Sequence, residues 1–402
     1  ILLGQDEQTI VKDFSSAIHC RGAFLVANPL IMWGYNNDQI NNLIEKVQKE
    51  YYLLVMGWGF FDDNLIALSH SIRNIERGVP FLKKELKISQ KYEGVPVFII
   101  GNGPSLDESI NFVKENKEFA ILISCGSAIT ALHKHGIKPD ILVQVERTKS
   151  IYDFMVNLDD PEYLKDILFF STDVIHPDCP TLFKRSILAF KNNEPGEILC
   201  QTYFPLASEK FAKLRAVNPL VGNIGISAPI QLGFKNLYLF GLDNGYKNKE
   251  HHHSKSSAYY NSEKNAKILG ELMYSTNERY CEANFGGVVI SNAMYDTSRY
   301  IIEQVLAENR TVNCINCSDG AKIAGTRSVP CSEVGLYQKL DKSSILDEIK
   351  TRLCSPLTLP MQDLHGFLDI DFFNYFIDKV IDEWKQDFSS RSQINQLMLK
   401  HF

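Results

Sequence analysis

A loop bracketed by two glycines, between a buried strand and a polar helix, is the segment of this sequence best suited to bind an anion. It lies in Val95-Pro-Val-Phe-Ile-Ile-Gly-Asn-Gly-Pro-Ser-Leu106. Gly101 and Gly103 carry no Cβ, so backbone amides can approach a ligand closely. Pro104 is a stiff lead-in and Ser105 a natural N-cap. A strand end, a bare loop and a helix N-terminus suit the phosphate of a nucleotide, although ordinary α/β folds also contain such turns.

The second strand argues against the two commonest nucleotide cradles. A dinucleotide fold places an acidic residue about 20 positions on, at the end of that strand, to hold the ribose. Here the strand over 119–123 ends in Ser124-Cys125-Gly126-Ser127 without a carboxylate, and the loop lacks a third glycine. The sequence also has no Gly-x-x-x-x-Gly-Lys-Ser/Thr segment. It therefore predicts a nucleotide site that is not built for NAD, or for ATP in a P-loop.

Two further strand-end loops carry small or polar residues. Gly222 and Asn223 open a helix and offer a phosphate or sugar contact, although tight packing of a helix N-terminus explains the same pattern. The apolar run 237–240 ends a strand, and Asp243 and Tyr246 follow it. Ligands of an open α/β sheet bind beyond the carboxyl ends of its strands, so these loops are expected to face the ligand.

Three consecutive histidines, His251, His252 and His253, come next, deep inside the chain. The run resembles a metal-binding tract or an expression tag, but consecutive side chains in a loop point in different directions. A histidine beside phosphate loops is suited to act as a general base, because its pKa is near the working pH. Five lysines between 235 and 264 add positive charge that suits a phosphate leaving group. The alternative is a solvated polar loop.

Composition narrows the class of protein. Of 402 residues, 45% are hydrophobic and 22% charged, as in globular proteins, and the net charge of −6 does not favour nucleic-acid or membrane-surface binding. No apolar run reaches the ~18 residues of a membrane span. Nine cysteines are irregularly spaced, and the pair Cys314 and Cys317 has no second pair to complete a zinc site. We expect reduced thiols, no metal and a cytoplasmic protein. Because the chain begins with Ile1, we also expect a fragment or a processed form.

Three domains are expected along the chain. Residues 1–90 are predicted to form a smaller α/β domain, with a helix over 39–49 and a strand over 52–57. Residues 91–330 alternate strands and helices, and their continuous apolar runs indicate a mostly parallel sheet covered on both faces. Residues 331–402 are predicted to be helical, either as a cap over the site or as a partner-binding surface. The predicted central strands are 97–100, 120–123, 141–145, 167–170, 186–190 and 237–240, and the predicted helices are 65–77, 105–117, 127–134, 224–232, 344–353, 372–388 and 393–402.

Three motifs resemble the bacterial sialyltransferases that build lipo-oligosaccharides. They are Ile100-Gly-Asn-Gly-Pro-Ser-Leu106, Leu232-Gly-Phe-Lys-Asn-Leu-Tyr-Leu-Phe-Gly-Leu-Asp243 and His253-Ser-Lys255. The resemblance implies that the glycine loop and the following strand ends hold CMP, with Asn102 and Ser105 in that loop and Asp243 supporting it. It further implies that His253 is the general base and that Tyr246 contacts the leaving phosphate. The spacing of Tyr246 from Asp243 differs from that of the sialyltransferases, and the adjacent histidines leave the choice of base open.

Over its whole length the chain more closely resembles the motility-associated factor (Maf) flagellin glycosyltransferases. The similar segments are Pro139-Asp-Ile-Leu-Val-Gln-Val-Glu-Arg-Thr148, Gly222-Asn223 and Asn316-Cys-Ser-Asp-Gly-Ala-Lys-Ile-Ala-Gly-Thr-Arg-Ser-Val-Pro330. The resemblance implies a Rossmann-like nucleotide-sugar domain, flanked by an N-terminal α/β domain and a helical C-terminal domain. It implies transfer of pseudaminic or legionaminic acid from a CMP donor to flagellin serine or threonine, and a flagellin chaperone is a further expected partner.

The predicted enzyme is an inverting, metal-independent transferase whose CMP-sugar is a substrate, without any cofactor. Such sugars leave CMP through an oxocarbenium-like state, so the enzyme has to position a hydroxyl, accept its proton and neutralise the phosphate. Two alternatives remain, a pterin pyrophosphokinase using Mg-ATP and a non-catalytic flagellin-binding protein. The predicted catalytic residues are His253 and Tyr246, and the predicted nucleotide contacts are Gly101, Asn102, Gly103, Ser105, Ser124, Gly126, Gly222, Asn223 and Asp243.

Overall fold

The computed structural model describes residues 37, 38, 40–42, 44, 61–261, 278–359 and 370–401. The chain divides into two compact units, one of residues 59–359 and one of residues 1–58 with 360–402. Within the described ranges, no helix has the length and apolar character needed to cross a membrane. The larger unit contains every residue of the predicted site.

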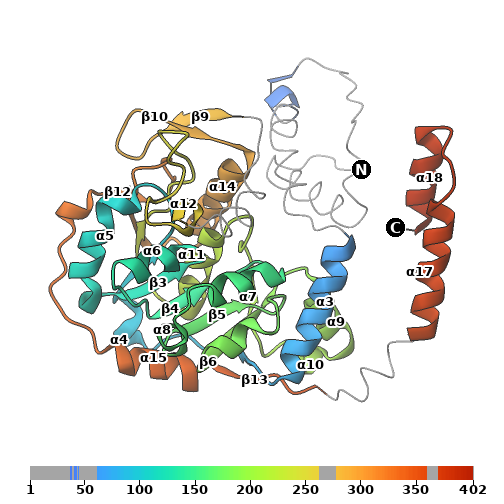
Figure 1. Ribbon diagram of the computed structural model, residues 1–402, viewed down its shortest axis with the longest axis horizontal. Coiled ribbons are helices and arrows are strands. Elements are labelled where there is room, and N and C mark those ends of the chain that lie inside the picture. The colour runs from blue at the N-terminus through green and yellow to red at the C-terminus, as the bar shows by residue number, and fades with distance from the viewer. Residues whose placement is uncertain are drawn as a thin grey trace. The chain divides into compact units, whose positions relative to one another are not determined.

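The larger unit is built on one 11-stranded sheet with the order β12-β11-β8-β2-β3-β4-β5-β6-β1-β13, and β7 pairs with β6 beside this path. Figure 1 shows the neighbouring strands β3, β4, β5 and β6 of this sheet. All its strand pairs are parallel except β1 with β13. Strands β9 and β10 form a separate antiparallel hairpin. The strands are β1 (Pro80–Leu82), β2 (Pro96–Ile100), β3 (Ile121–Cys125), β4 (Ile141–Val143), β5 (Leu168–Thr172), β6 (Arg185–Lys191), β7 (Lys213–Leu214), β8 (Asn236–Phe240), β9 (Arg279–Glu282), β10 (Val288–Ser291), β11 (Asn313–Asn316), β12 (Arg327–Ser328) and β13 (Cys354–Pro356).

Helices cover both faces of the sheet, because successive strand residues point to opposite sides. In β2, Val97 and Ile99 join a core with α11, α14 and α15, whereas Phe98 and Ile100 join a core with α5 and α6. The helices of this unit are α3 (Phe61–Glu76), α4 (Gln90–Glu93), α5 (Leu106–Glu115), α6 (Ala128–Lys134), α7 (Lys149–Val156), α8 (Pro161–Lys165), α9 (Pro195–Tyr203), α10 (Pro205–Ser208), α11 (Val221–Leu232), α12 (Ala258–Asn261), α14 (Ala293–Glu308) and α15 (Lys342–Thr351), with short 3-10 turns η2 (Lys117–Phe119), η3 (Cys179–Leu182) and η4 (Cys331–Glu333).

The strand order reverses beside β2, which fixes where a ligand can bind. From β2 the chain proceeds in one direction through β3, β4, β5 and β6, and it returns to the other side of β2 with β8. In open α/β sheets the crevice at such a reversal, beyond the carboxyl ends of the strands, is the usual ligand site. The loops that follow β2, β3 and β8 therefore meet at the expected position. The predicted α/β class with a mostly parallel sheet is confirmed.

The predicted central strands are all present as β2 to β6 and β8, but the unit extends beyond the predicted 91–330. Strand β1 precedes residue 91, and α15 and β13 follow residue 330, yet both short strands complete the edge of the same sheet. These strands contain only three residues each, too few for a periodic pattern. The predicted helix 65–77 corresponds to α3, and the predicted helix 344–353 to α15.

In the second unit, the predicted helices 372–388 and 393–402 correspond to α17 (Ile370–Trp384) and α18 (Arg391–His401). Lys400 pairs with Glu383 at 2.7 Å and thereby links these two helices. The predicted strand 52–57 lies outside the described residues. Of the predicted helix 39–49, only residues 40–42 and 44 are described, and they are helical.

Candidate functional site at the carboxyl ends of the central strands

The loop after β2 packs so closely on the loop after β8 that only glycine fits at two positions. Gly101 N–H donates to the Phe240 carbonyl and Gly103 N–H to the Gly241 carbonyl, each at 2.8 Å. A Cβ on Gly103 would lie 1.9 Å from Asp243 Oδ2, and one on Gly101 would lie 2.4 Å from the Gly241 oxygen. The two glycines thus serve close packing of the loops, and their amides are engaged within the fold instead of facing a ligand as the sequence suggested.

Asp243 takes the place of the predicted serine cap at the start of α5. The Ser105 side chain makes no capping hydrogen bond, whereas its backbone N–H donates to Asp243 Oδ2 at 3.1 Å. Asp243 is 3% exposed, and burial raises the pKa of its carboxyl to about 7. Its Oδ1 atom has no hydrogen-bond partner among the described residues. The carboxyl is therefore held in place through one oxygen and has the other available.

Asn102 joins three loops through its side chain. Its Nδ2 atom donates to Ser127 Oγ at 2.9 Å and to Ser257 Oγ at 2.8 Å. Its backbone carbonyl accepts from Ser254 N–H at 2.9 Å. The amide oxygen Oδ1 is buried and has no hydrogen-bond partner in the described parts of the chain. Asn102 therefore connects the glycine loop to the loop after β3 and to the histidine segment, and it keeps one acceptor unused.

The end of β3 contributes a third acceptor. Ser124 is fully buried, and its Oγ atom also lacks a partner among the residues described. Gly126 adopts a positive φ of 53°, which a side chain disfavours, and its N–H donates to the Val143 carbonyl at 3.0 Å. A Cβ there would lie 3.0 Å from Val221 Cγ1, at the start of α11. Gly126 therefore allows the sharp turn from β3 into α6.

Gly222 and Asn223 have packing roles in the structure. The Asn223 Oδ1 atom accepts from Leu220 N–H at 3.1 Å and from Ser298 Oγ at 2.9 Å, and its Nδ2 atom donates to the Ser298 carbonyl at 3.0 Å. The side chain therefore caps α11 and fastens it to α14. A Cβ on Gly222 would lie 3.3 Å from Leu242 Cδ2. The sequence was equally consistent with tight packing of this helix N-terminus, and the structure shows such packing. We therefore do not propose Asn223 as a ligand contact.

Three acceptors without a partner among the described residues thus lie where β2, β3 and β8 end, at Asn102 Oδ1, Ser124 Oγ and Asp243 Oδ1, and the Ser105 hydroxyl beside them is unpaired as well. Buried polar atoms in proteins are nearly always hydrogen-bonded, because an unmade bond costs about 1–3 kcal/mol. Three such atoms on adjacent strands indicate a place that a hydrogen-bond donor completes. A ligand with amino and hydroxyl groups has the matching chemistry.

His253 differs from its two histidine neighbours in its surroundings. Its Nδ1 atom lies 2.6 Å from the His252 carbonyl, which can only accept, so Nδ1 carries the proton and Nε2 keeps a lone pair. Its ring centroid lies 4.0 Å from that of Tyr259. Desolvation lowers the pKa of His253 to about 4, so the imidazole is neutral at physiological pH. A neutral histidine whose Nε2 has no hydrogen-bond partner among the described residues can accept a proton.

Tyrosine side chains surround this histidine segment. The ring of Tyr246 lies 6.4 Å from those of His252 and Tyr295, centroid to centroid. Burial raises the pKa of Tyr246, Tyr259 and Tyr295, so all three hydroxyls stay protonated near neutral pH. The sequence predicted a role for Tyr246 alone. No motif in the sequence indicated Tyr259, or Tyr295 in the first turn of α14.

Charged residues also lie at the ends of β4 and β6. Arg147 and Lys191 both pair with Glu194, at 3.1 and 2.7 Å, and all three side chains are largely buried. Glu146 is exposed to solvent, yet desolvation still raises the pKa of its carboxyl, and its charge acts on Tyr259.

Asp243→Asn is expected to remove a pH dependence of stability. The carboxyl binds a proton more tightly in the folded protein, with a pKa of about 7, than at its ordinary value of 3.8. Relative to the variant, the wild-type free energy of unfolding should therefore fall as pH rises from about 4 to about 7 and stay constant above. Urea denaturation at several pH values measures this difference. An unchanging difference would contradict the buried carboxyl, and Asp62→Asn on the exposed start of α3 is the control.

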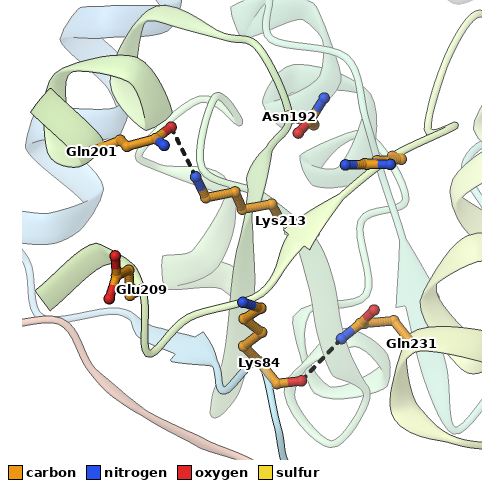
Figure 2. Close-up of a pocket in the computed structure, with 7 residues that line it drawn as sticks. Lys84, Asn192, Gln201, Glu209, Lys213 and Gln231 are labelled. Carbon is orange, nitrogen blue, oxygen red and sulfur yellow. Dashed lines mark hydrogen bonds between the residues drawn. The ribbon is translucent and has the colours of Figure 1, made fainter. Parts of the chain in front are cut away.

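A cavity of about 520 Å³ lies elsewhere in the larger unit, away from the predicted site residues. Figure 2 shows Lys213 pointing toward Gln201, whose Oε1 atom it contacts at 3.0 Å. Lys213 also pairs with the buried carboxylate of Glu197, which compensates its charge. The lining residues are Lys84, Asn192, Gln201, Glu209, Lys213, Arg215 and Gln231. None of them belongs to the loops that follow β2, β3 and β8.

Comparisons with known proteins agree with this architecture. Residues 69–249 match the family model described as 6-hydroxymethylpterin diphosphokinase MptE-like. The structure matches that of a Maf glycosyltransferase from Magnetospirillum magneticum AMB-1 with a TM-score of 0.72 and 23% sequence identity. The match covers 100% of this chain and 59% of that chain. No curated protein matches this sequence. The resemblance to Maf glycosyltransferases is thus confirmed in the fold.

Proposed function

We propose, from the fold shared with a Maf glycosyltransferase, that this protein transfers a nonulosonic acid from a CMP donor to serine or threonine hydroxyls of flagellin. The donor sugar would be pseudaminic or legionaminic acid, and the reaction would take place in the cytoplasm with inversion and without a metal. The observation that carries the proposal is the group of three unpaired acceptors at Asn102, Ser124 and Asp243, beside a neutral histidine.

The nucleotide half of the donor fits these acceptors by chemistry. CMP presents an exocyclic amino group and two ribose hydroxyls, and each of these can donate to a carboxamide, hydroxyl or carboxyl oxygen. Asn102 Oδ1 and Asp243 Oδ1 belong to the loops after β2 and β8, which flank the reversal of strand order. We therefore place the nucleoside in this crevice, with Ser124, at the end of β3, as a further hydrogen-bond acceptor.

The transfer step follows from the roles of His253 and the tyrosines. The acceptor hydroxyl oxygen attacks the anomeric carbon of the sugar, and its proton passes to His253 Nε2. The bond from that carbon to the phosphate oxygen breaks, and its electron pair leaves with CMP. The oxocarbenium-like state needs little acid catalysis at the sugar. Attack from the face opposite the leaving group inverts the anomeric centre.

The departing phosphate needs hydrogen-bond donors. Tyr246, Tyr259 and Tyr295 keep their hydroxyl protons because burial raises their pKa, so each can donate to a phosphate oxygen. Lys247 and Lys249, which the sequence also suggested for this purpose, pair with Asp319 and Glu278. The proposal therefore assigns the leaving group to the tyrosines, with Tyr246 as the first contact.

Thermal unfolding with CMP and with Mg-ATP tests the nucleotide assignment. CMP is expected to raise the Tm of the wild type in the presence of EDTA, and Asn102→Ala should lose this shift because it removes an acceptor and a link between loops. Asn116→Ala, at the far end of α5, is the matched control and should keep the shift. A CMP shift that requires a divalent metal would overturn the metal-independent assignment.

The family model supports a second candidate, a pterin diphosphokinase that uses Mg-ATP. In that case the same experiment should give a magnesium-dependent shift with ATP and none with CMP. A protein that responds to neither nucleotide would instead fit a non-catalytic role, such as holding flagellin or a flagellin chaperone.

A further inference from the structure

The segment that carries His253 is held in place by side chains from the starts of α5 and α6. Ser254 and Ser257 are only 1% and 0% exposed, so the segment is buried before and after the exposed Lys255. Beyond Ser257, Ala258 N–H donates to Thr130 Oγ1 at 3.3 Å. An irregular segment needs such contacts, because no helix or sheet hydrogen bonds fix its backbone.

Asp107 makes the largest number of these contacts from one side chain. Its Oδ1 atom accepts from Ser254 Oγ at 2.5 Å and from Lys255 N–H at 3.1 Å, and its Oδ2 atom accepts from Lys255 N–H at 3.0 Å. Asp107 lies in the first turn of α5, where a carboxylate also interacts favourably with the helix dipole. A dipole effect alone, however, requires no contact with residues almost 150 positions away.

A comparison with the neighbouring Glu108 distinguishes the helix-dipole interaction from the contacts to Ser254 and Lys255. Glu108 occupies the same first turn and carries the same charge, but it is exposed and, within the described residues, makes no hydrogen bond or ion pair to the histidine segment. Asp107 and Glu108 therefore share the dipole interaction and differ in the contacts to Ser254 and Lys255. Since Ser254 directly follows His253, a shift at Asp107 is transmitted to the imidazole through one peptide unit.

We propose that Asp107 is a positioning residue for the proton acceptor His253, which it holds through Ser254 and Lys255. This rests on the proposed function, because it assumes that His253 takes the proton of the acceptor hydroxyl. Asn102 acts from the other side, through the hydrogen bond from Ser254 N–H to its carbonyl. The glycine loop and the proton acceptor are thus fixed as one assembly, so that nucleotide binding and base placement depend on the same short stretch, residues 102–107.

Asp107→Asn tests the proposal, with Glu108→Gln as the matched control. Asparagine keeps the size of the side chain but replaces one acceptor oxygen with a donor, which faces the Lys255 N–H or the Ser254 hydroxyl. The expected result is a fall in kcat of about 10- to 100-fold with little change in the KM for the CMP-sugar, as found when a supporting contact is lost. Glu108→Gln should retain kcat within about 2-fold, a change too small to indicate a lost contact.

Hydrogen–deuterium exchange of the backbone amides gives a readout that does not depend on activity. In Asp107→Asn the amides of residues 254–258 should exchange faster, while those of β2 and β3 stay protected, so that general unfolding is distinguished from release of the segment. Unchanged exchange and unchanged kcat in the variant would overturn the positioning role. If the wild type has no transfer activity but the amides of residues 254–258 exchange faster in Asp107→Asn, the proposed function is wrong, whereas the contact between Asp107 and the histidine segment is confirmed.

Discussion

Replacing His253 with alanine is expected to reduce kcat for sugar transfer by at least about 100-fold, the usual contribution of a general base. The expectation rests on the geometry of the imidazole, because Nδ1 is used by the His252 carbonyl at 2.6 Å and Nε2 is left to accept the proton. The fold should survive, since the side chain is only partly buried. Initial rates with saturating donor measure kcat directly, and the CMP-induced rise in Tm shows whether the nucleotide site is intact.

The adjacent histidines supply the controls for this variant. His252 holds the His253 ring through its backbone carbonyl, which His252→Ala retains. We therefore expect His251→Ala and His252→Ala to keep most of the activity. A large loss in His252→Ala, together with an active His253→Ala, would show that the base has been assigned to the wrong residue.

The pH profile of the wild type provides a second check on His253. Its pKa is lowered to about 4, so the base is deprotonated at neutral pH and becomes protonated only in acid. Activity limited by this group should therefore stay constant as pH falls from about 7 to about 5 and decrease only below that. A decrease centred near the ordinary histidine pKa of 6.5 would indicate a base in a more solvated position.

Gly103→Ala is expected to abolish nucleotide binding and to destabilise the protein. The new Cβ would lie 1.9 Å from Asp243 Oδ2 and 2.7 Å from the Gly241 oxygen, so the loops after β2 and β8 have to separate. Overpacking of this kind costs about 1–3 kcal/mol. The separation also breaks the contact between Ser105 N–H and Asp243, and with it the arrangement of the unpaired acceptors.

Gly94→Ala, just before β2, is the matched control because its Cβ would meet only Asn236 Nδ2, at 3.9 Å. Urea denaturation measures the loss of stability in both variants, and calorimetric titration with CMP measures binding. Equal stability and equal CMP affinity in Gly103→Ala and Gly94→Ala would contradict the close packing of the two loops. A destabilised Gly103→Ala that still binds CMP at low temperature would place the nucleotide away from this crevice.

The sequence was sufficient for the elements whose signal is local. Six central strands and the helices α5, α6 and α11 followed from the sequence, because a strand buried on both faces needs apolar residues at every position. The helices α7, α8, α9 and α10 between the same strands were not predicted. The same runs predicted a parallel sheet, and hence a ligand site where its strands end. The edge strands β1 and β13 could not be predicted, since three residues form a strand only when the neighbouring chain supplies the hydrogen bonds.

The roles of individual site residues depended on contacts between distant segments. Gly103 was recognised as important from its loop, but the reason, the nearby carboxylate of Asp243, lies 140 residues further on. Asn223 had the pattern of a ligand contact, yet its amide is used by Leu220 and Ser298. The contact of Asp107 with Ser254 had no sequence signal, because one carboxylate at a helix start is common.

By itself, the sequence determined the fold class, the order of the central strands along the chain and the loops in which a site must lie. Only the tertiary structure decided which polar atoms of the described residues stay unpaired, which of the three histidines is desolvated, and which side chains hold its segment in place. The physical reason is that strand formation and turns depend on neighbours in sequence, whereas hydrogen-bond pairing and desolvation depend on neighbours in space.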